Sequence, residues 1–179
     1  MNATSVREFL DDTRDVVDQA LNARTVAFSA VFAAAVAVAT YAMPISIGAG
    51  YFNLGEVLIY TAAFLFGPIV AGLAGGVGAA AADAYLGYMM WVPITFVVKG
   101  LEGAVVGYLA GQDPRRKVLA VAVGAPIMIV GYFVASAYLI GFPYAIGNEL
   151  PMDVLQAVVG LAVALPLSKA VESRVPQLQ

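Results

Sequence analysis

Neither cysteine nor histidine occurs in this chain of 179 residues. Without cysteine there can be no disulfide, thiolate metal site or cysteine nucleophile, and without histidine the commonest general base and metal ligand is missing. Most hydrolase chemistries are therefore excluded, and we expect neither catalysis nor a bound metal or cofactor. The GxxxxGK[ST] motif that cradles nucleotide phosphates is also absent, so the chain by itself does not hydrolyse ATP.

Charged residues are scarce, at 12% of the chain, whereas 61% of the residues are hydrophobic. A soluble domain is typically about a quarter charged and about half apolar. This excess of apolar residues is typical of a protein that crosses the membrane several times. No long basic run occurs, so we do not expect nucleic-acid binding.

The apolar residues form uncharged runs long enough to cross a bilayer. One long run is interrupted by Gly67-Pro68, and we divide it there because proline disfavours helix at the residue before it. A single kinked helix is the alternative at that point. The sequence thus predicts an all-α membrane protein with six transmembrane helices, at residues 26–43, 53–66, 69–87, 94–109, 118–140 and 152–171.

The first 24 residues differ from the rest, because charges alternate there with apolar residues near helical spacing. We expect an amphipathic helix at residues 1–24, followed by a transmembrane domain at residues 25–175. The helix would lie on the membrane surface or against a partner, and a solvated helix without a role is the alternative.

Basic residues predict the orientation of the six helices. The loops at 44–52, 88–93 and 141–151 contain no Lys or Arg. The opposite side would hold Arg7, Arg14, Arg24, Arg115, Arg116, Lys117, Lys169 and Arg174. Because positive charge marks cytoplasmic loops, we expect both termini in the cytoplasm and the protein in the plasma membrane.

Four charges interrupt the apolar stretch from Gly50 to Gly111, and all would lie in the outer half of their helices. Ionisable groups at membrane depth usually face a cavity or each other and serve function. Lys99 and Glu102 are three residues apart and share a helix face. In the last helix Asp153 and Gln156 have the same spacing, again near the outer end. The predicted ligand-binding residues are Asn53, Glu56, Asp83, Tyr88, Trp91, Lys99, Glu102, Asn148, Asp153 and Gln156.

The charges near Lys99 favour one kind of ligand. Glu56, Asp83 and Glu102 give three acids against one base, and an uncompensated negative charge is costly where water is scarce. A neutral-to-cationic heterocycle with hydrogen-bond donors therefore fits better than a dicarboxylate or a phosphate ester. The alternative is structural: Lys99 would pair with Glu102 or Asp83 only to hold helices together, and Glu56 would cap a helix.

An ordered series of short motifs resembles the S components of energy-coupling factor (ECF) transporters, and most closely the riboflavin and hydroxymethylpyrimidine group. The series covers about residues 26–170. It consists of Gly50-Tyr51-Phe52-Asn53-Leu54-Gly55-Glu56, Phe66-Gly67-Pro68, Ala82-Asp83, Gly87-Tyr88, Lys99-Gly100-Leu101-Glu102-Gly103, Gly131-Tyr132-Phe133 and Leu155-Gln156-Ala157.

The resemblance implies a six-helix subunit that captures a vitamin or vitamin precursor from outside, such as riboflavin, hydroxymethylpyrimidine or thiamine. It also implies partners: a transmembrane T component and two ATPase subunits. In such proteins small residues spaced by four on the first helix contact the T component. Here these are Ala30 and Ala34, with Ala33 and Ala37 as the shifted alternative. The loop 44–52 would cover the ligand.

Other readings stay open from the residues alone. A stand-alone proton- or ion-coupled carrier would use Glu56, Asp83 or Glu102 as its titrating group. A membrane enzyme lacks an evident nucleophile and base in this sequence. A purely structural membrane scaffold would explain the small-residue ridges but not four charges at one level.

Overall fold

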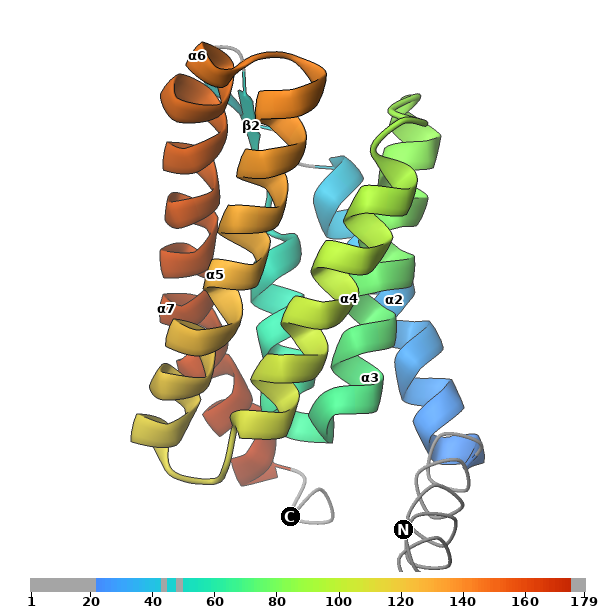
Figure 1. The fold of residues 1–179 in the computed structure, drawn as a ribbon. Coiled ribbons are helices and arrows are strands. Elements are labelled where there is room, and N and C mark those ends of the chain that lie inside the picture. The colour runs from blue at the N-terminus through green and yellow to red at the C-terminus, as the bar shows by residue number, and fades with distance from the viewer. Residues whose placement is uncertain (1–21, 43–44, 48–49, 175–179) are drawn as a thin grey trace, which may run out of the picture.

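Five long helices form the bundle in the computed structural model, which describes residues 22–42, 45–47 and 50–174 (Figure 1). They are α2 (Ala23–Ala42), α3 (Gly55–Leu86), α4 (Val92–Leu109), α5 (Pro114–Leu139) and α7 (Leu150–Arg174). Each is long and apolar enough to cross a membrane, the last together with the residues that precede it from Phe142. The helix predicted for residues 1–24 lies almost wholly outside the described residues.

Shorter elements lie at one end of the bundle. Strands β1 (Ile45–Ile47) and β2 (Gly50–Phe52) pair antiparallel, with Ile45 opposite Phe52, where the sequence predicted only a loop. Helix α6 (Phe142–Tyr144) and the π-helix η1 (Ala145–Glu149) lead into α7. In Figure 1 β2 and α6 lie together at this end, which we call the hairpin end.

The predicted break at Gly67-Pro68 is the sharpest feature of α3. Gly67 has a left-handed backbone (φ 78°, ψ −164°), and glycine adopts such a conformation far more readily than other residues. The chain reverses here: a Cβ built on Gly75 would lie 3.4 Å from Ile59 Cδ1, although a continuous helix would hold them about 24 Å apart. Figure 1 shows the two arms of α3 side by side.

The described residues therefore contain five long helices, whereas the sequence predicted six. The difference arises at α3, where residues 55–66 and 68–86 form one element with a kink at Gly67. The other bounds differ by a few residues. The largest difference is at α5, which begins at Pro114 rather than near 118. Asp113 caps it by accepting a hydrogen bond from the Arg115 N–H (2.9 Å), and proline is favoured in a first turn. The basic cluster predicted as a loop is thus helical.

Small residues bring α3 and α4 into backbone contact. A Cβ on Gly103 would lie 2.5 Å from the Ala71 carbonyl oxygen, and one on Gly75 would lie 2.6 Å from the Lys99 carbonyl oxygen. No side chain larger than hydrogen fits at these two positions. Close backbone approach through small residues is how helices associate in lipid, where the hydrophobic effect does not hold them together. This packing fixes the height of Lys99 relative to α3.

Helix α2 packs against α3 on one face only. Its buried residues are Ser29, Val36 and Thr40, and Ala33 lies against Gly78 of α3. The opposite face is exposed and contains both Ala30 and Ala34. Of the two alanine pairs proposed from the sequence, Ala30 and Ala34 are thus the pair that faces away from the bundle.

The end of the bundle opposite the hairpin carries six of the seven basic residues that the structure describes, the exception being Lys99. One of them, Lys117, is buried between helices, although the sequence placed it in a cytoplasmic loop. Its Nζ donates to Glu172 Oε1 of α7 (2.8 Å) and to Ser168 Oγ (3.5 Å), and it lies 5.4 Å from the ring centroid of Phe64. Lys117 therefore joins α3, α5 and α7 at this end.

Replacing Lys117 should loosen this end of the bundle. Lys117→Met leaves the partly exposed Glu172 without its partner, which should cost less than the about 3–5 kcal/mol of breaking a fully buried ion pair from one side. We expect a clearly lower thermal unfolding temperature in detergent. Lys169→Met, at an exposed position on α7, is the matched control and should unfold like the wild type. Equal unfolding temperatures for both variants would show that the Lys117 contacts contribute nothing.

Candidate ligand-binding site

A cavity of about 240 Å³ opens between the helices toward the hairpin end. Every long helix contributes residues from its end nearest the hairpin, and η1 completes the wall. The lining consists of Thr40, Asn53, Gly55, Glu56, Ile59, Ala79, Asp83, Tyr88, Trp91, Thr95, Lys99, Tyr132, Ile140, Tyr144, Asn148, Glu149, Met152, Asp153 and Gln156. A pocket with both aromatic and convergent polar residues is suited to a small ligand.

Nine of the ten ligand-binding residues predicted from the sequence line this cavity. They are Asn53, Glu56, Asp83, Tyr88, Trp91, Lys99, Asn148, Asp153 and Gln156. The tenth, Glu102, lies one layer deeper, fully buried beneath Lys99. Tyr85, which is close in sequence to Asp83 and Tyr88, instead faces outward and packs against Tyr41, with ring centroids 4.6 Å apart.

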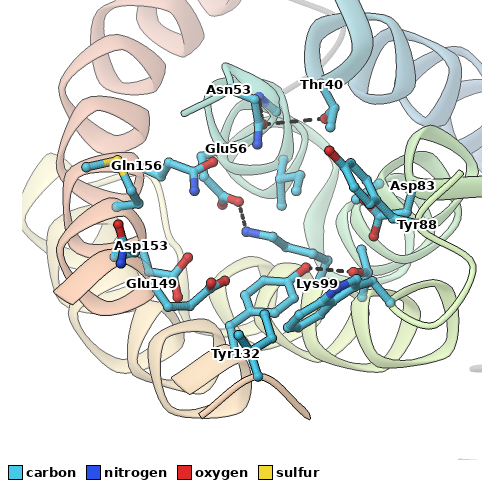
Figure 2. Close-up of a pocket in the computed structure, with 18 of the residues that line it drawn as sticks. Thr40, Asn53, Glu56, Asp83, Tyr88, Lys99, Tyr132, Glu149, Asp153 and Gln156 are labelled. Atoms are coloured by element: carbon cyan, nitrogen blue, oxygen red, sulfur yellow. Dashed lines mark hydrogen bonds and ion pairs between the residues drawn. The ribbon is translucent and has the colours of Figure 1, made fainter. Parts of the chain in front are cut away.

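Lys99 lies at the centre of the charged groups (Figure 2). Its Nζ donates to Glu56 Oε1 on α3 and contacts Met128 Sδ on α5. It lies 3.5 Å from Glu102 Oε2, one turn along α4, and 5.4 Å from the ring centroid of Tyr132. One ammonium group thus links two carboxylates and touches three helices.

Two hydroxyl groups support this arrangement, one below the cavity and one in its wall. The Tyr60 hydroxyl donates to Glu102 Oε1 (2.7 Å), so both oxygens of that buried carboxylate have partners. The Tyr132 hydroxyl donates to Thr95 Oγ1 (3.0 Å), which fixes the ring beside Lys99. Glu102 therefore orients Lys99 and does not reach the cavity.

Aromatic side chains form another part of the wall. Trp91 at the start of α4 lies 6.1 Å from Tyr132 of α5, centroid to centroid, with the ring planes tilted by 56°. Tyr88 and Tyr144 also line the cavity. Aromatic faces beside buried charge favour a flat ring, which can stack on them while its edge meets the polar groups.

Helix α7 supplies the remaining polar wall. Asp153 and Gln156 are three residues apart and share a helix face, as predicted, and both are buried. The π-helix before α7 changes the register of the chain, so that Asn148 and Glu149 line the same cavity. π-Helical turns often occur at functional sites. Within the described residues no cluster of His, Cys, Asp or Glu could hold a metal ion.

Sequence reasoning missed several lining residues, among them Thr40, Thr95, Tyr132 and Tyr144. Tyr132 and Thr95 lie inside uncharged runs, where nothing distinguishes a residue that faces the cavity from one that packs in the core. The sequence placed Glu149 among the polar groups at the same level as the charges, and it lines the cavity. Thr40 has no comparable signal in the sequence.

The family of ECF-type riboflavin transporter S components matches residues 20–173, which is most of the chain. The chain belongs to this family. A Pyrococcus woesei protein, described only as an uncharacterized protein in a gap 3' region, is 38% identical over 135 residues, 74% of this chain and 90% of that protein. The thiamine precursor transporter HmpT of Lactococcus lactis subsp. cremoris (strain MG1363) is 33% identical over 133 residues, 74% of this chain and 76% of HmpT. The resemblance inferred from the motifs is confirmed.

Replacing Lys99 should destabilise the bundle, because it strands Glu56 and Glu102 in an apolar surrounding. For Lys99→Met we expect a loss of about 3–5 kcal/mol in the free energy of unfolding, measured by denaturation in detergent. Adding Glu56→Gln removes one stranded charge and should restore part of the loss. A Lys99→Met variant as stable as the wild type, with no change on adding Glu56→Gln, would rule out the pairing.

Proposed function

We propose that this S component captures a small vitamin-like heterocycle from outside the cell and delivers it to an ECF module for ATP-driven uptake. The observation that carries this proposal is the cavity: a polar and aromatic pocket at one end of a bundle whose outer surface is apolar. The relative HmpT is described as a thiamine precursor transporter, which supports a vitamin precursor as the ligand.

The cavity would open to the outside. Six basic residues lie at the end of the bundle opposite the hairpin, and positive charge favours the cytoplasmic side. The two arms of α3 would each enter the membrane, so that the chain crosses it six times. The first arm, residues 55–66, is about 18 Å long, shorter than the roughly 30 Å hydrocarbon core. We infer that the arm begins below the outer surface, which would leave space for the ligand above Glu56.

Uptake against a gradient requires partners, because the chain has no nucleotide-binding motif. Family membership supports a transmembrane T component and two ATPase subunits as these partners. The exposed face of α2 would receive the T component. Small residues there let another helix approach closely, and Ala30 and Ala34 stand one turn apart on that face.

A stand-alone carrier is the second candidate, favoured by the buried acids around Lys99. Transport into vesicles separates the two functions. The chain reconstituted alone should bind the ligand but not accumulate it, with or without an imposed proton gradient. Reconstituted with T and ATPase subunits, it should accumulate ligand only when ATP is supplied. Proton-driven uptake by the chain alone would contradict our proposal and support the carrier.

Bulk on the exposed face of α2 should block assembly. Ala30→Trp and Ala34→Trp fill the groove that a partner helix would occupy, so co-purification with the T component should fall at least about tenfold. Ligand affinity should stay within a few-fold, because neither residue lines the cavity. Ala122→Trp, on the exposed face of α5, is the matched control and should still assemble. Assembly and transport by both α2 variants would exclude this docking face.

A further inference from the structure

Three buried oxygens in the cavity wall lack hydrogen-bond partners among the residues that the structure describes. They are Glu56 Oε2 on α3 and Asp153 Oδ2 and Gln156 Oε1 on α7. Their residues are only 2%, 3% and 6% exposed, and all three line the cavity. In Figure 2 Gln156 and Asp153 lie along the α7 side of the pocket, and Glu56 meets Lys99 beside them.

All three atoms are hydrogen-bond acceptors. A buried acceptor without a partner destabilises a protein, and native structures rarely keep several in one place unless a ligand or water satisfies them. The nearest cation, Lys99, already contacts Glu56 Oε1, Glu102 and Met128. A ligand that binds against this wall must therefore supply the hydrogen-bond donors for these three oxygens.

The charges around the wall oppose an anionic ligand. Carboxylates face it from α3 (Glu56, Asp83) and from the α7 side (Glu149, Asp153), and Glu102 lies behind Lys99. Lys99 is the one cation among the described lining residues. A phosphate or carboxylate group on the ligand would meet an excess of negative charge in a place that water does not screen.

We propose that the wall formed by Glu56, Asp153 and Gln156 selects an amidine-type edge on a small, unphosphorylated nitrogen heterocycle, and that Asp153 decides this choice. This inference rests on the proposed function. An aminopyrimidine presents two N–H donors on its amino group and a third when the neighbouring ring nitrogen is protonated. When that nitrogen is protonated, its N–H and one amino N–H lie parallel, and a carboxylate accepts both at once, as it does from arginine.

An imide edge, such as that of a flavin, has the opposite pattern. It offers one N–H between two carbonyl oxygens, so two acceptors of the ligand would face acceptors of the wall. The size of the cavity also favours an aminopyrimidine over a flavin. Its volume of about 240 Å³ is below the roughly 300–1,000 Å³ of sites for drug-sized ligands. A single substituted ring suits it better than three fused rings.

Calorimetric binding in detergent tests the inference with four probes. They are the hydroxymethyl-aminopyrimidine half of thiamine, the same ring with a carbonyl in place of the amino group, the phosphate ester of the aminopyrimidine, and riboflavin. Because sites built to pair a polar group strongly reject analogues that lack it, the aminopyrimidine should bind at least about 100-fold more tightly than the oxo analogue. The phosphate ester and riboflavin should bind more weakly as well.

The Asp153→Asn variant tests the named residue. Its amide replaces one acceptor oxygen by a donor, so preference for the aminopyrimidine over the oxo analogue should fall at least about tenfold. Asp113→Asn is the matched control: it makes the same change at an exposed position at the opposite end of the bundle and should keep the preference. Asparagine also caps helices well, so α5 should be unaffected.

The inference and the proposed function fail in different ways. Wild-type protein that binds riboflavin or the phosphate ester as tightly as the aminopyrimidine overturns the inference, and so does an unchanged preference in a folded Asp153→Asn variant. In either case ATP-dependent uptake by the full complex would keep the proposed function. If Asp153→Asn does not fold, the four probes on the wild type decide. Absence of binding for every probe, together with absence of uptake, overturns both.

Discussion

One buried ammonium group determines how the helices around the cavity are arranged. Lys99 on α4 contacts Glu56 on α3 and Glu102 on its own helix, in an interior that is mostly apolar. A lone charge would be very costly there, and so would either carboxylate without the lysine. The three groups must therefore stay together, and the helices that carry them must keep their relative height. The hydrogen bond from the Tyr60 hydroxyl to Glu102 also ties α3 to α4 at this height.

Close packing of α3 and α4 at glycines allows Lys99 to reach Glu56. Gly75 and Gly103 let the backbones of α3 and α4 touch, which places Glu56 and Lys99 at one level although they are 43 residues apart in the chain. The reversal at Gly67 has a related effect, because it returns α3 to the hairpin end and puts Asp83 near its own starting residues. The cavity, the charges and the aromatic wall thus depend on three glycines: Gly75 and Gly103 leave no room for a side chain, and Gly67 has a left-handed backbone.

The sequence predicts much of this and fails where packing decides. Uncharged runs and proline positions locate the helices, and the three-residue spacing of Lys99 and Glu102 places them on one face. The same reasoning cannot tell which acid Lys99 pairs with, because that depends on contacts between distant segments. It also assigned Lys117 to a loop, since a basic residue that follows two arginines near a helix end looks solvated, whereas it is buried against Ser168 and Glu172 of α7. Nothing in the sequence shows that Tyr132 and Thr95 face a cavity, although Tyr132 belongs to one of the motifs that carry the family resemblance.

An experimental structure of the protein loaded with the molecule that co-purifies with it would test most directly whether this cavity is the ligand site. We expect that molecule between α3, α4 and α7, with its donor groups within hydrogen-bond distance of Glu56, Asp153 or Gln156 and a ring face on Trp91 or Tyr132. A tightly bound molecule elsewhere on the protein, with only water among these residues, would contradict the assignment of the site.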